Sequence, residues 1–179
     1  MKNTLLPKSK VAVLVIDLGG SNRIVGDNTY DGGFNLRKLA KIELLLQYAQ
    51  VQSLPCYATE YQFSTIEMLI PYIPRENIFQ KSDWDAFKWT NLASRLRESH
   101  VTHLVPVGFN LDACVLATTR TAVRLDYSVL TSADLMFTGG DCNPYGIEAM
   151  NFYKTKTRYF DSGEQLLEAV KLLSEAERN

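Results

Sequence analysis

The fold is decided by the stretch His103-Leu-Val-Pro-Val-Gly-Phe-Asn-Leu-Asp-Ala-Cys-Val-Leu-Ala-Thr-Thr119, which combines a short apolar strand, a turn and the start of a helix. The strand is predicted over 104–107 and ends at Gly108, and the helix is predicted over 113–125. This places the Cys114 thiol at a helix N-terminus, where the backbone dipoles favour thiolate over thiol. Cys114 is therefore a candidate nucleophile. The alternative is a core residue, because free cysteine is among the most buried residue types.

Strands and helices alternate along the rest of the chain. Val11-Ala-Val-Leu-Val-Ile-Asp17 is a continuous apolar run, which is typical of a strand buried on both faces of a parallel sheet. Further strands are predicted over 56–59, 77–80, 127–131 and 157–160, and further helices over 36–54, 65–70, 90–99, 146–153 and from Ser162 onward. The last helix opens with Ser162-Gly-Glu-Gln165, the arrangement of a capping box. Such alternation predicts a parallel sheet with helices on both faces.

Length and charge restrict the class of protein. The 179 residues fit a single domain over 1–179, with 46 % hydrophobic and 22 % charged residues, which is ordinary for a globular protein. Nineteen basic residues face twenty acidic ones, with no long run of either sign. Neither nucleic acid nor a membrane surface is therefore expected as a partner.

The cysteines and the first residues indicate a compartment. Cys56, Cys114 and Cys142 are an odd number without CxxC spacing, so neither a disulfide framework nor a zinc knuckle is predicted. Cys56 is expected in the core, and Cys142 suggests no chemical role. The first residues lack the apolar run of a secretory signal, and no stretch reaches membrane-spanning length. We therefore expect a cytoplasmic protein, whose free thiol remains available for chemistry.

Three reactive side chains follow the carboxyl ends of predicted strands, which is the edge where open parallel sheets bind ligands. Asp17 ends the first strand, Lys81 follows the third, and Cys114 follows the fourth. Each has a simpler explanation, since Asp17 could cap the following glycine turn and Lys81 could be a solvated lysine. Together, the three side chains have the chemistry that a nucleophilic thiol needs. A carboxylate can take the thiol proton, an ammonium can lower the thiol pKa, and backbone N–H groups of the 110–114 turn can hold an oxyanion.

Three segments carry a resemblance that covers nearly the whole chain. Val13-Leu-Val-Ile-Asp17, Lys81-Ser-Asp-Trp-Asp-Ala-Phe87 and Gly108-Phe-Asn-Leu-Asp-Ala-Cys114-Val115 resemble, in order and spacing, the signature segments of the isochorismatase-like cysteine hydrolases. The resemblance implies a Rossmann-like three-layer α/β/α sandwich around a six-stranded parallel sheet of order 3-2-1-4-5-6. That order puts the first and fourth strands side by side, so that Asp17 and Cys114 flank one crevice.

The resemblance also implies a role for each site residue. Asp17 would be the base, Lys81 its electrostatic partner and Cys114 the nucleophile. A cis peptide bond would lie at Phe109–Asn110, and the backbone amides of Asn110 and Cys114 would form the oxyanion hole. It further implies a small-molecule substrate, no cofactor, and a homo-oligomer that is a dimer or larger. Tyr145, Phe152 and Tyr153 could supply the interface or belong to the core.

The chain also departs from the family pattern. The loop Leu18-Gly-Gly-Ser-Asn22 lacks the Gln that usually lies two positions after the aspartate. The nicotinamidase branch has a metal site of one Asp and several His near the second strand, whereas the matching stretch Thr59-Glu-Tyr-Gln-Phe-Ser64 contains no histidine. His100 and His103 are expected at the opposite end of the sheet. We therefore expect no metal centre and disfavour nicotinamidase activity.

For the substrate pocket, we expect contributions from Asn22 in the unusual loop and from Trp84 and Phe87, although both aromatic rings could equally pack the loop onto the sheet. For Trp89, packing is favoured. The predicted function is a cofactor-free cysteine hydrolase that cleaves a small amide or related acyl compound through a Cys114 thioester. The alternative is a catalytically silent binding or scaffold member of the same fold. A vinyl-ether hydrolase is disfavoured, because that chemistry does not need a thiol.

Overall fold

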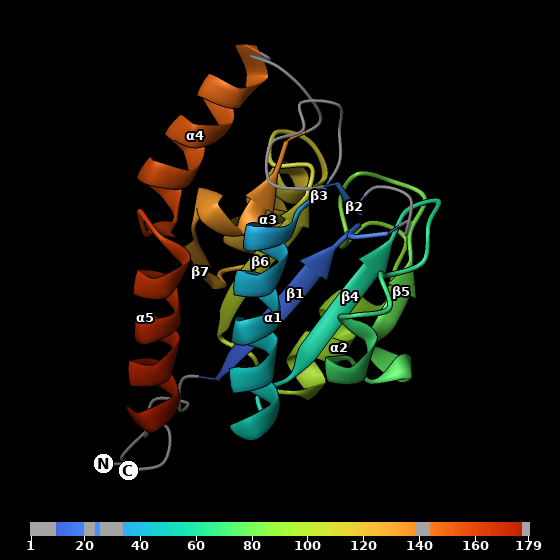
Figure 1. The fold of residues 1–179 in the computed structure, drawn as a ribbon, viewed down its shortest axis with the longest axis vertical. Coiled ribbons are helices and arrows are strands. Elements are labelled where there is room, and N and C mark those ends of the chain that lie inside the picture. The colour runs from blue at the N-terminus through green and yellow to red at the C-terminus, as the bar shows by residue number, and fades with distance from the viewer. Residues whose placement is uncertain (1–9, 20–23, 26–33, 139–143, 177–179) are drawn as a thin grey trace, which may run out of the picture.

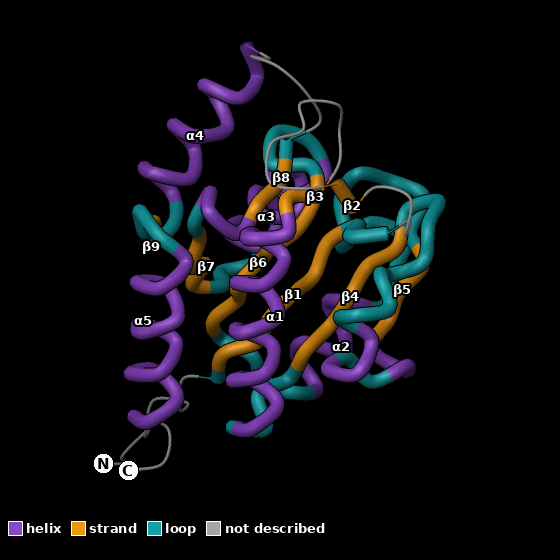
Figure 2. Tube along the Cα trace, in the orientation of Figure 1, coloured by secondary structure: helices purple, strands orange, loops and turns teal. Residues whose placement is uncertain are grey.

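A mixed α/β architecture is built around one parallel sheet in the computed structural model, which describes residues 10–19, 24–25, 34–138 and 144–176. The main sheet has seven strands in the order β5-β4-β1-β6-β7-β9, with β8 paired to β6 beside that path, and all of its pairings are parallel. The strands are β1 (Val11–Ile16), β4 (Cys56–Glu60), β5 (Ile78–Gln80), β6 (His103–Phe109), β7 (Ser128–Thr131), β8 (Met136–Phe137) and β9 (Arg158–Tyr159). The predicted order 3-2-1-4-5-6 is confirmed, and β8 is a short strand that the sequence did not predict (Figure 2). A separate pair is formed by β2 (Ile24–Val25) and β3 (Phe34–Asn35).

Helices cover both faces of the sheet, as predicted (Figure 1). On one face lie α1 (Leu36–Val51) and α5 (Gly163–Ala176), and on the other lie α2 (Leu92–Glu98) and α3 (Cys114–Arg124). The remaining helix, α4 (Pro144–Lys156), adds its buried side chains to the same hydrophobic cluster as α3 and extends away from the sheet at the top of Figure 1. Within the described ranges, no helix has the length and apolar character needed to cross a membrane.

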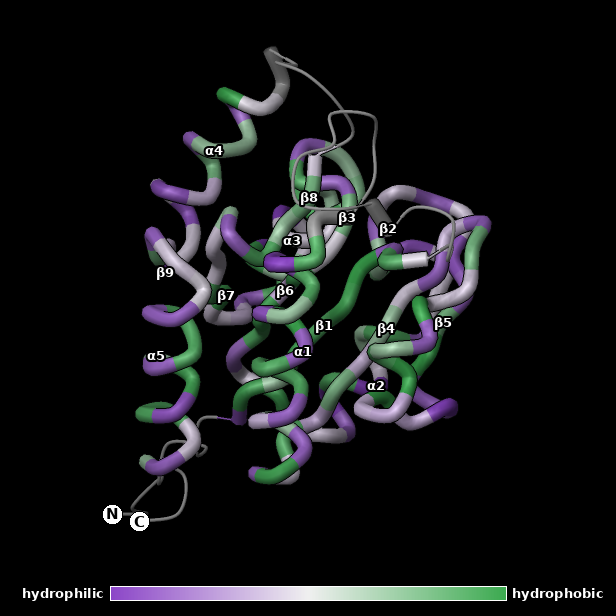
Figure 3. The backbone as a smooth tube through the Cα atoms, in the orientation of Figure 1, coloured by the Kyte–Doolittle hydropathy of each residue, from purple (hydrophilic) through white to green (hydrophobic). Residues whose placement is uncertain are grey.

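The central strand β1 separates two hydrophobic cores. It is hydrophobic along its whole length (green in Figure 3), and each of its residues is at most 1 % exposed. Val11, Val13 and Val15 pack with α1 and α5, whereas the alternate side chains pack with α2 and α3. This is the two-residue period of a strand buried on both faces, and it explains why the run contains no polar residue.

Two helices differ from the prediction in their boundaries or type, and a third begins as predicted. The helix predicted over 65–70 is replaced by turns and a short 3₁₀ helix, Ile70–Tyr72, which has Pro71 in its first turn. Helix α1 ends at Val51, three residues early, and Ser53 adopts the left-handed φ of 55° that typically closes a helix. The predicted cap of α5 is present, since the Gln165 amide donates to Ser162 Oγ at 3.3 Å.

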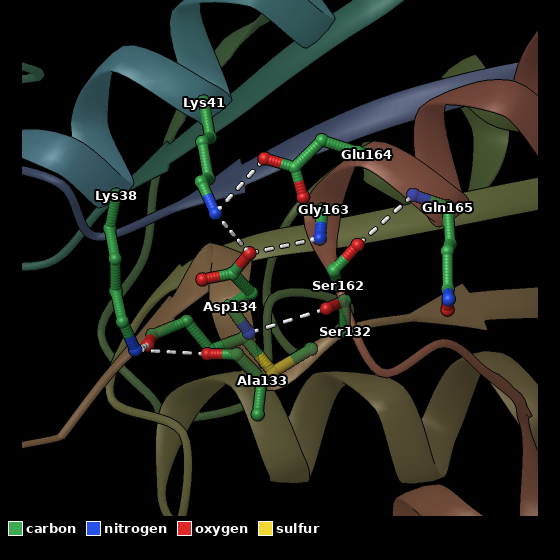
Figure 4. A network of polar contacts seen from close by, with 10 residues as sticks. Lys38, Lys41, Ser132, Ala133, Asp134, Ser162, Gly163, Glu164 and Gln165 are labelled. Carbon is green, nitrogen blue, oxygen red and sulfur yellow. Dashed lines mark hydrogen bonds and ion pairs between the residues drawn. The ribbon is translucent and has the colours of Figure 1, made fainter.

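Polar contacts join α1, α5 and the segment before β8 (Figure 4). Asp134 Oδ2 accepts from Lys41 Nζ at 2.6 Å and from the backbone amide of Gly163 at 3.0 Å, at the start of α5. Lys38 Nζ donates to the carbonyls of Ala133 at 3.0 Å and Met136 at 2.7 Å. The network fixes the segment that leads into β8, which in turn borders the turn before Cys114.

Candidate active site

The three predicted reactive side chains meet at the carboxyl edge of the sheet. Asp17 directly follows β1, Lys81 directly follows β5, and Cys114 is the first residue of α3. Lys81 Nζ lies 2.7 Å from Asp17 Oδ2. The Asp17 carboxyl also shares a hydrogen bond with the Cys114 thiol. The structure therefore forms a continuous chain of contacts from ammonium to carboxylate to sulfur.

Lys81 is held rigidly. Its side chain is 0 % exposed, and its ammonium donates to the carbonyls of Asp83 at 2.9 Å and Trp84 at 3.2 Å. It also lies 5.1 Å from the centre of the Tyr61 ring, within the range of a cation–π contact. Together with the Asp17 contact, these partners offset the cost of burying the charge and exclude the simpler explanation of a solvated lysine.

Asp17 is positioned by the neighbouring strand β4. The amide of Asp17 donates to the Thr59 carbonyl at 3.0 Å, and Thr59 Oγ1 donates to Asp17 Oδ1 at 3.4 Å. Burial raises the pKa of the Asp17 carboxyl above its ordinary value, although the contacts with Lys81, Cys114 and Thr59 act in the opposite direction. A carboxylate of raised pKa is a stronger proton acceptor than a solvated one. Thr59 is not among the predicted site residues, although its place at the end of the strand predicted over 56–59 was the available signal.

The pKa of the Cys114 thiol is raised, opposite to the direction that its place at a helix N-terminus favours. Its side chain is buried, and the pKa of the thiol is raised to about 11, chiefly by burial and then by the nearby charge of Asp17. Lys81 and the backbone of Asn110 lower that pKa, but by less. Burial and the Asp17 charge therefore outweigh the Lys81 ammonium and the Asn110 N–H.

The turn between β6 and α3 brings backbone groups close to the sulfur. Gly108 has a φ of 127°, and a Cβ there would lie 2.1 Å from the Ile16 carbonyl oxygen, so only glycine fits where β6 passes the end of β1. The next peptide bond, Phe109–Asn110, is cis, as the resemblance implies. The backbone N–H of Asn110 donates to the Cys114 sulfur. The amides of Ala113 and Val115 both donate to the Asn110 carbonyl at 3.0 Å, which closes the turn.

The loop after Asp17 is fixed at its first two residues. The Leu18 carbonyl accepts from the Ile66 amide at 2.8 Å, and Gly19 forms an antiparallel bridge with Thr65. A Cβ at Gly19 would lie 2.7 Å from the Phe63 carbonyl oxygen, so glycine permits this close approach. Asn22 lies outside the described residues, and its substrate-binding role stays a prediction.

The three aromatic residues of the second signature segment have different surroundings. Trp84 is 59 % exposed and lines a cavity of about 540 Å³ beside the start of α3. Phe87 stacks on Tyr127, with ring centroids 6.2 Å apart, and packs against the core, as the packing alternative expects; its role in substrate binding stays a prediction. Trp89 is 80 % exposed, which contradicts the expectation that it packs the loop. The cavity is lined by Trp84, Asn110, Asp112, Ala113, Leu116, Ala117, Arg120 and Glu148.

Glu60 occupies the end of β4, in the stretch compared above with a metal-binding segment. Its Oε1 accepts from the Thr65 amide at 2.6 Å, and its Oε2 accepts from the Gln80 side chain. One carboxylate oxygen thus holds the loop beside the site, and the other holds the end of β5. Across the described part of the chain, no group of three or more His, Cys, Asp or Glu residues is arranged to hold a metal ion. His103 begins β6, at the edge of the sheet opposite Cys114.

An open parallel α/β sheet with a cysteine, a carboxylate and a lysine at its carboxyl edge is typical of a class of cysteine hydrolases, and comparison with known proteins gives the family. Residues 11–155 match the family model described as the isochorismatase domain, so the chain belongs to the isochorismatase family. The fold is similar to a nicotinamidase from Staphylococcus aureus, with a TM-score of 0.69 and 19 % identity over 85 % of this chain and 99 % of that one. It is also similar to N-carbamoylsarcosine amidase from Thermoplasma acidophilum, with a TM-score of 0.68 and 15 % identity over 87 % of this chain and 97 % of that one.

One similarity is seen in sequence alone. A stretch of 61 residues is 38 % identical to streptothricin hydrolase from Streptomyces noursei. It covers 34 % of this chain and 22 % of that protein, so the match spans only about a fifth of the relative. At these levels of identity and coverage, the structural neighbours show the fold, and the substrate of this chain has to be argued from its own site.

Proposed function

We propose that the protein is a cysteine hydrolase that cleaves the C–N bond of a small amide through a thioester on Cys114. The observation that carries this proposal is the buried chain of contacts from Lys81 through Asp17 to Cys114. The names of the similar proteins, a nicotinamidase, an amidase and a streptothricin hydrolase, support the same class of reaction. The proposed chemistry needs no cofactor.

In the first half of the reaction, Asp17 accepts the thiol proton while the Cys114 sulfur attacks the carbonyl carbon of the amide. The backbone amides of Asn110 and Cys114 donate to the resulting oxyanion. The tetrahedral intermediate then collapses, and the C–N bond breaks as Asp17 returns the proton to the leaving amine. The acyl group remains on the sulfur as a thioester.

In the second half, a water molecule takes the place of the amine. Asp17 accepts one of its protons as the oxygen attacks the thioester carbonyl, and the C–S bond breaks. The proton returns to the sulfur, and the acid is released. One amide and one water thus give one carboxylic acid and one amine. The proton is exchanged between Asp17 and the reacting atoms throughout, and Lys81 holds the carboxylate in place and stabilises its charge.

A panel of small primary and secondary amides tests the proposal. Wild-type protein is expected to release ammonia or amine, and mass spectrometry of acid-quenched protein should show an acyl adduct on the peptide that contains Cys114. Cys114→Ala should form no adduct and lose turnover. The matched control is Cys56→Ala, because Cys56 is also buried but lies in β4, where burial raises its pKa to about 12. Full activity in Cys114→Ala would overturn the mechanism, and wild-type protein without turnover or adduct would favour the catalytically silent alternative.

Assembly into a dimer or larger homo-oligomer and a cytoplasmic location stay predictions. Tyr153, one of the aromatic residues considered for an interface, is fully buried within the chain and belongs to the core.

A further inference from the structure

Tyr153 connects α4 to the turn that precedes Cys114. It is 0 % exposed, and its hydroxyl donates to the Leu111 carbonyl at 2.6 Å, across 42 residues of sequence. Leu111 lies between Asn110, whose backbone N–H contacts the sulfur, and the helix that Cys114 opens. The phenol is therefore one residue away from a backbone group to which the proposed function assigns oxyanion binding.

Leu111 is held on both sides of its backbone. Its carbonyl accepts from Tyr153, and its amide donates to the Phe137 carbonyl of β8 at 2.7 Å. The two peptide planes that flank Leu111 are thus fixed by different elements, α4 and β8. Because the amide of Leu111 shares its peptide plane with the Asn110 carbonyl, a shift of this plane would also move Asn110.

The Tyr153 hydroxyl also contacts the helix that carries the nucleophile. It lies beside Thr119 of α3, whose Oγ1 donates to the Val115 carbonyl at 2.7 Å. Burial, followed by the nearby charge of Asp112, raises the pKa of Tyr153. The phenol therefore stays neutral at physiological pH, which suits a fixed hydrogen-bond donor rather than a group that exchanges protons during turnover.

Other contacts between α4 and α3 lie at the surface. Arg120 Nη2 is 2.6 Å from Glu148 Oε1, and its guanidinium lies 5.4 Å from the Phe152 ring centre, but the Arg120 and Glu148 side chains are 43 % and 64 % exposed. Exposed pairs of this kind restrain a backbone weakly. The buried Tyr153 hydroxyl is better suited to define the distance between α4 and the turn.

We propose that Tyr153 is a positioning residue, which holds the Asn110–Cys114 turn in its active shape by donating to the Leu111 carbonyl. This inference rests on the proposed function, because it assigns the turn a role in stabilising the oxyanion. The hydroxyl touches no reacting atom. It acts on the reaction through the backbone of Leu111.

The test is Tyr153→Phe, which removes the hydroxyl and keeps the ring. Its matched control is Tyr57→Phe, because Tyr57 is 1 % exposed and its hydroxyl donates to Ser99 Oγ at 2.8 Å, next to α2 and away from the turn. For an amide that the wild type cleaves, Tyr153→Phe should lower kcat about tenfold, a fraction of the roughly 10²–10³-fold effect of deleting an oxyanion donor. KM should stay within about twofold. Tyr57→Phe should lower the melting temperature to a similar extent and leave kcat unchanged.

A second measurement needs no substrate. The rate of Cys114 alkylation by iodoacetamide is followed against pH, with the modified peptide identified by mass spectrometry. Because the Asn110 N–H stabilises the thiolate, a displaced turn should move the alkylation profile of Tyr153→Phe to higher pH, whereas that of Tyr57→Phe should match the wild type. If the wild type cleaves no amide, the proposed function fails, and the alkylation profile still decides the role of Tyr153.

Two results would overturn the inference: an unchanged kcat and alkylation profile in Tyr153→Phe, or equal losses of kcat in both tyrosine variants. Should Tyr153→Phe fail to fold at 25 °C by circular dichroism, both tyrosine variants are compared with the wild type at 10 °C. A lowered kcat with unchanged KM in Tyr153→Phe alone supports the inference, and an unchanged kcat overturns it.

Discussion

Replacing Lys81 by Met should destabilise the protein far more than the loss of an ordinary ion pair. The ammonium is fully buried and lies 2.7 Å from Asp17 Oδ2, whose side chain is only 6 % exposed. Met fills a similar volume but leaves the carboxylate buried without its counter-charge. Removing one partner of a buried pair costs about 3–5 kcal/mol of unfolding free energy. The carbonyls of Asp83 and Trp84 lose their hydrogen-bond donor as well. The expected loss of unfolding free energy is therefore toward the upper end of that range.

The loss should depend on pH in a defined direction. Burial already raises the pKa of Asp17 in the wild type, and the Lys81 contacts oppose that rise. Without the ammonium the folded-state pKa rises further. A carboxyl whose folded pKa exceeds its unfolded value of about 3.9 stabilises the fold fully at low pH, and this contribution is lost as pH rises through the folded pKa. The loss of unfolding free energy in Lys81→Met should therefore be largest near pH 8 and become smaller toward pH 5.

Urea unfolding at pH 8 and pH 5, followed by circular dichroism, measures both effects. The matched control is Lys171→Met, because Lys171 lies 2.6 Å from Glu168 but both side chains are well exposed, and its unfolding midpoint should not change measurably. The double variant Asp17→Asn/Lys81→Met should recover most of the lost stability, since a buried ion pair can often be replaced by neutral groups at little cost. A single variant as stable as the wild type at pH 8, or no recovery in the double variant, would refute the argument.

Two further predictions concern the sulfur and the turn before it. Asp17→Asn removes the nearby negative charge that raises the pKa of Cys114. Alkylation of Cys114 at pH 9 should therefore become faster, while amide hydrolysis should be lost. Slower alkylation would contradict the assigned charge effect. Gly108→Ala should lower the free energy of unfolding by at least about 2 kcal/mol, because a Cβ there overlaps the Ile16 carbonyl at a φ of 127°. The control is Gly146→Ala, because no atom lies within 4 Å of the added Cβ, and its free energy of unfolding should rise by up to about 1 kcal/mol. The melting temperatures of both variants measure these changes.

The parts of the fold that depend on periodicity could be predicted from the sequence. The run Val11–Asp17 is apolar throughout because both faces of β1 are covered, and the alternation of strands with helices follows from parallel pairing. The meeting of Asp17, Lys81 and Cys114 was predictable for the same reason. Carboxyl ends of parallel strands lie at one edge of the sheet, so residues far apart in sequence are brought together by topology alone.

The parts that depend on which side chain covers another could not be predicted. Phe87 and Trp89 lie two residues apart in one loop, yet Phe87 stacks on Tyr127 whereas Trp89 is 80 % exposed, and Trp89 adopts a left-handed φ of 60°. Similarly, nothing in the local sequence around Tyr153 indicates that its hydroxyl reaches Leu111, because that contact is set by the position of α4.

The pKa of the Cys114 thiol could not be predicted from the sequence, because it depends on burial. A cysteine that opens a helix beside a lysine satisfies two rules for a thiolate, and the Lys81 ammonium does lower the pKa of Cys114. Burial and the Asp17 carboxylate act against them, and the pKa rises to about 11. The outcome has a chemical consequence. A preformed thiolate would need no base, whereas a buried thiol bonded to a carboxylate of raised pKa must lose its proton to that carboxylate as it attacks. Under the proposed mechanism, Asp17 is therefore needed for nucleophilic attack itself. The effects of Asp17→Asn on alkylation and on hydrolysis separate these two mechanisms.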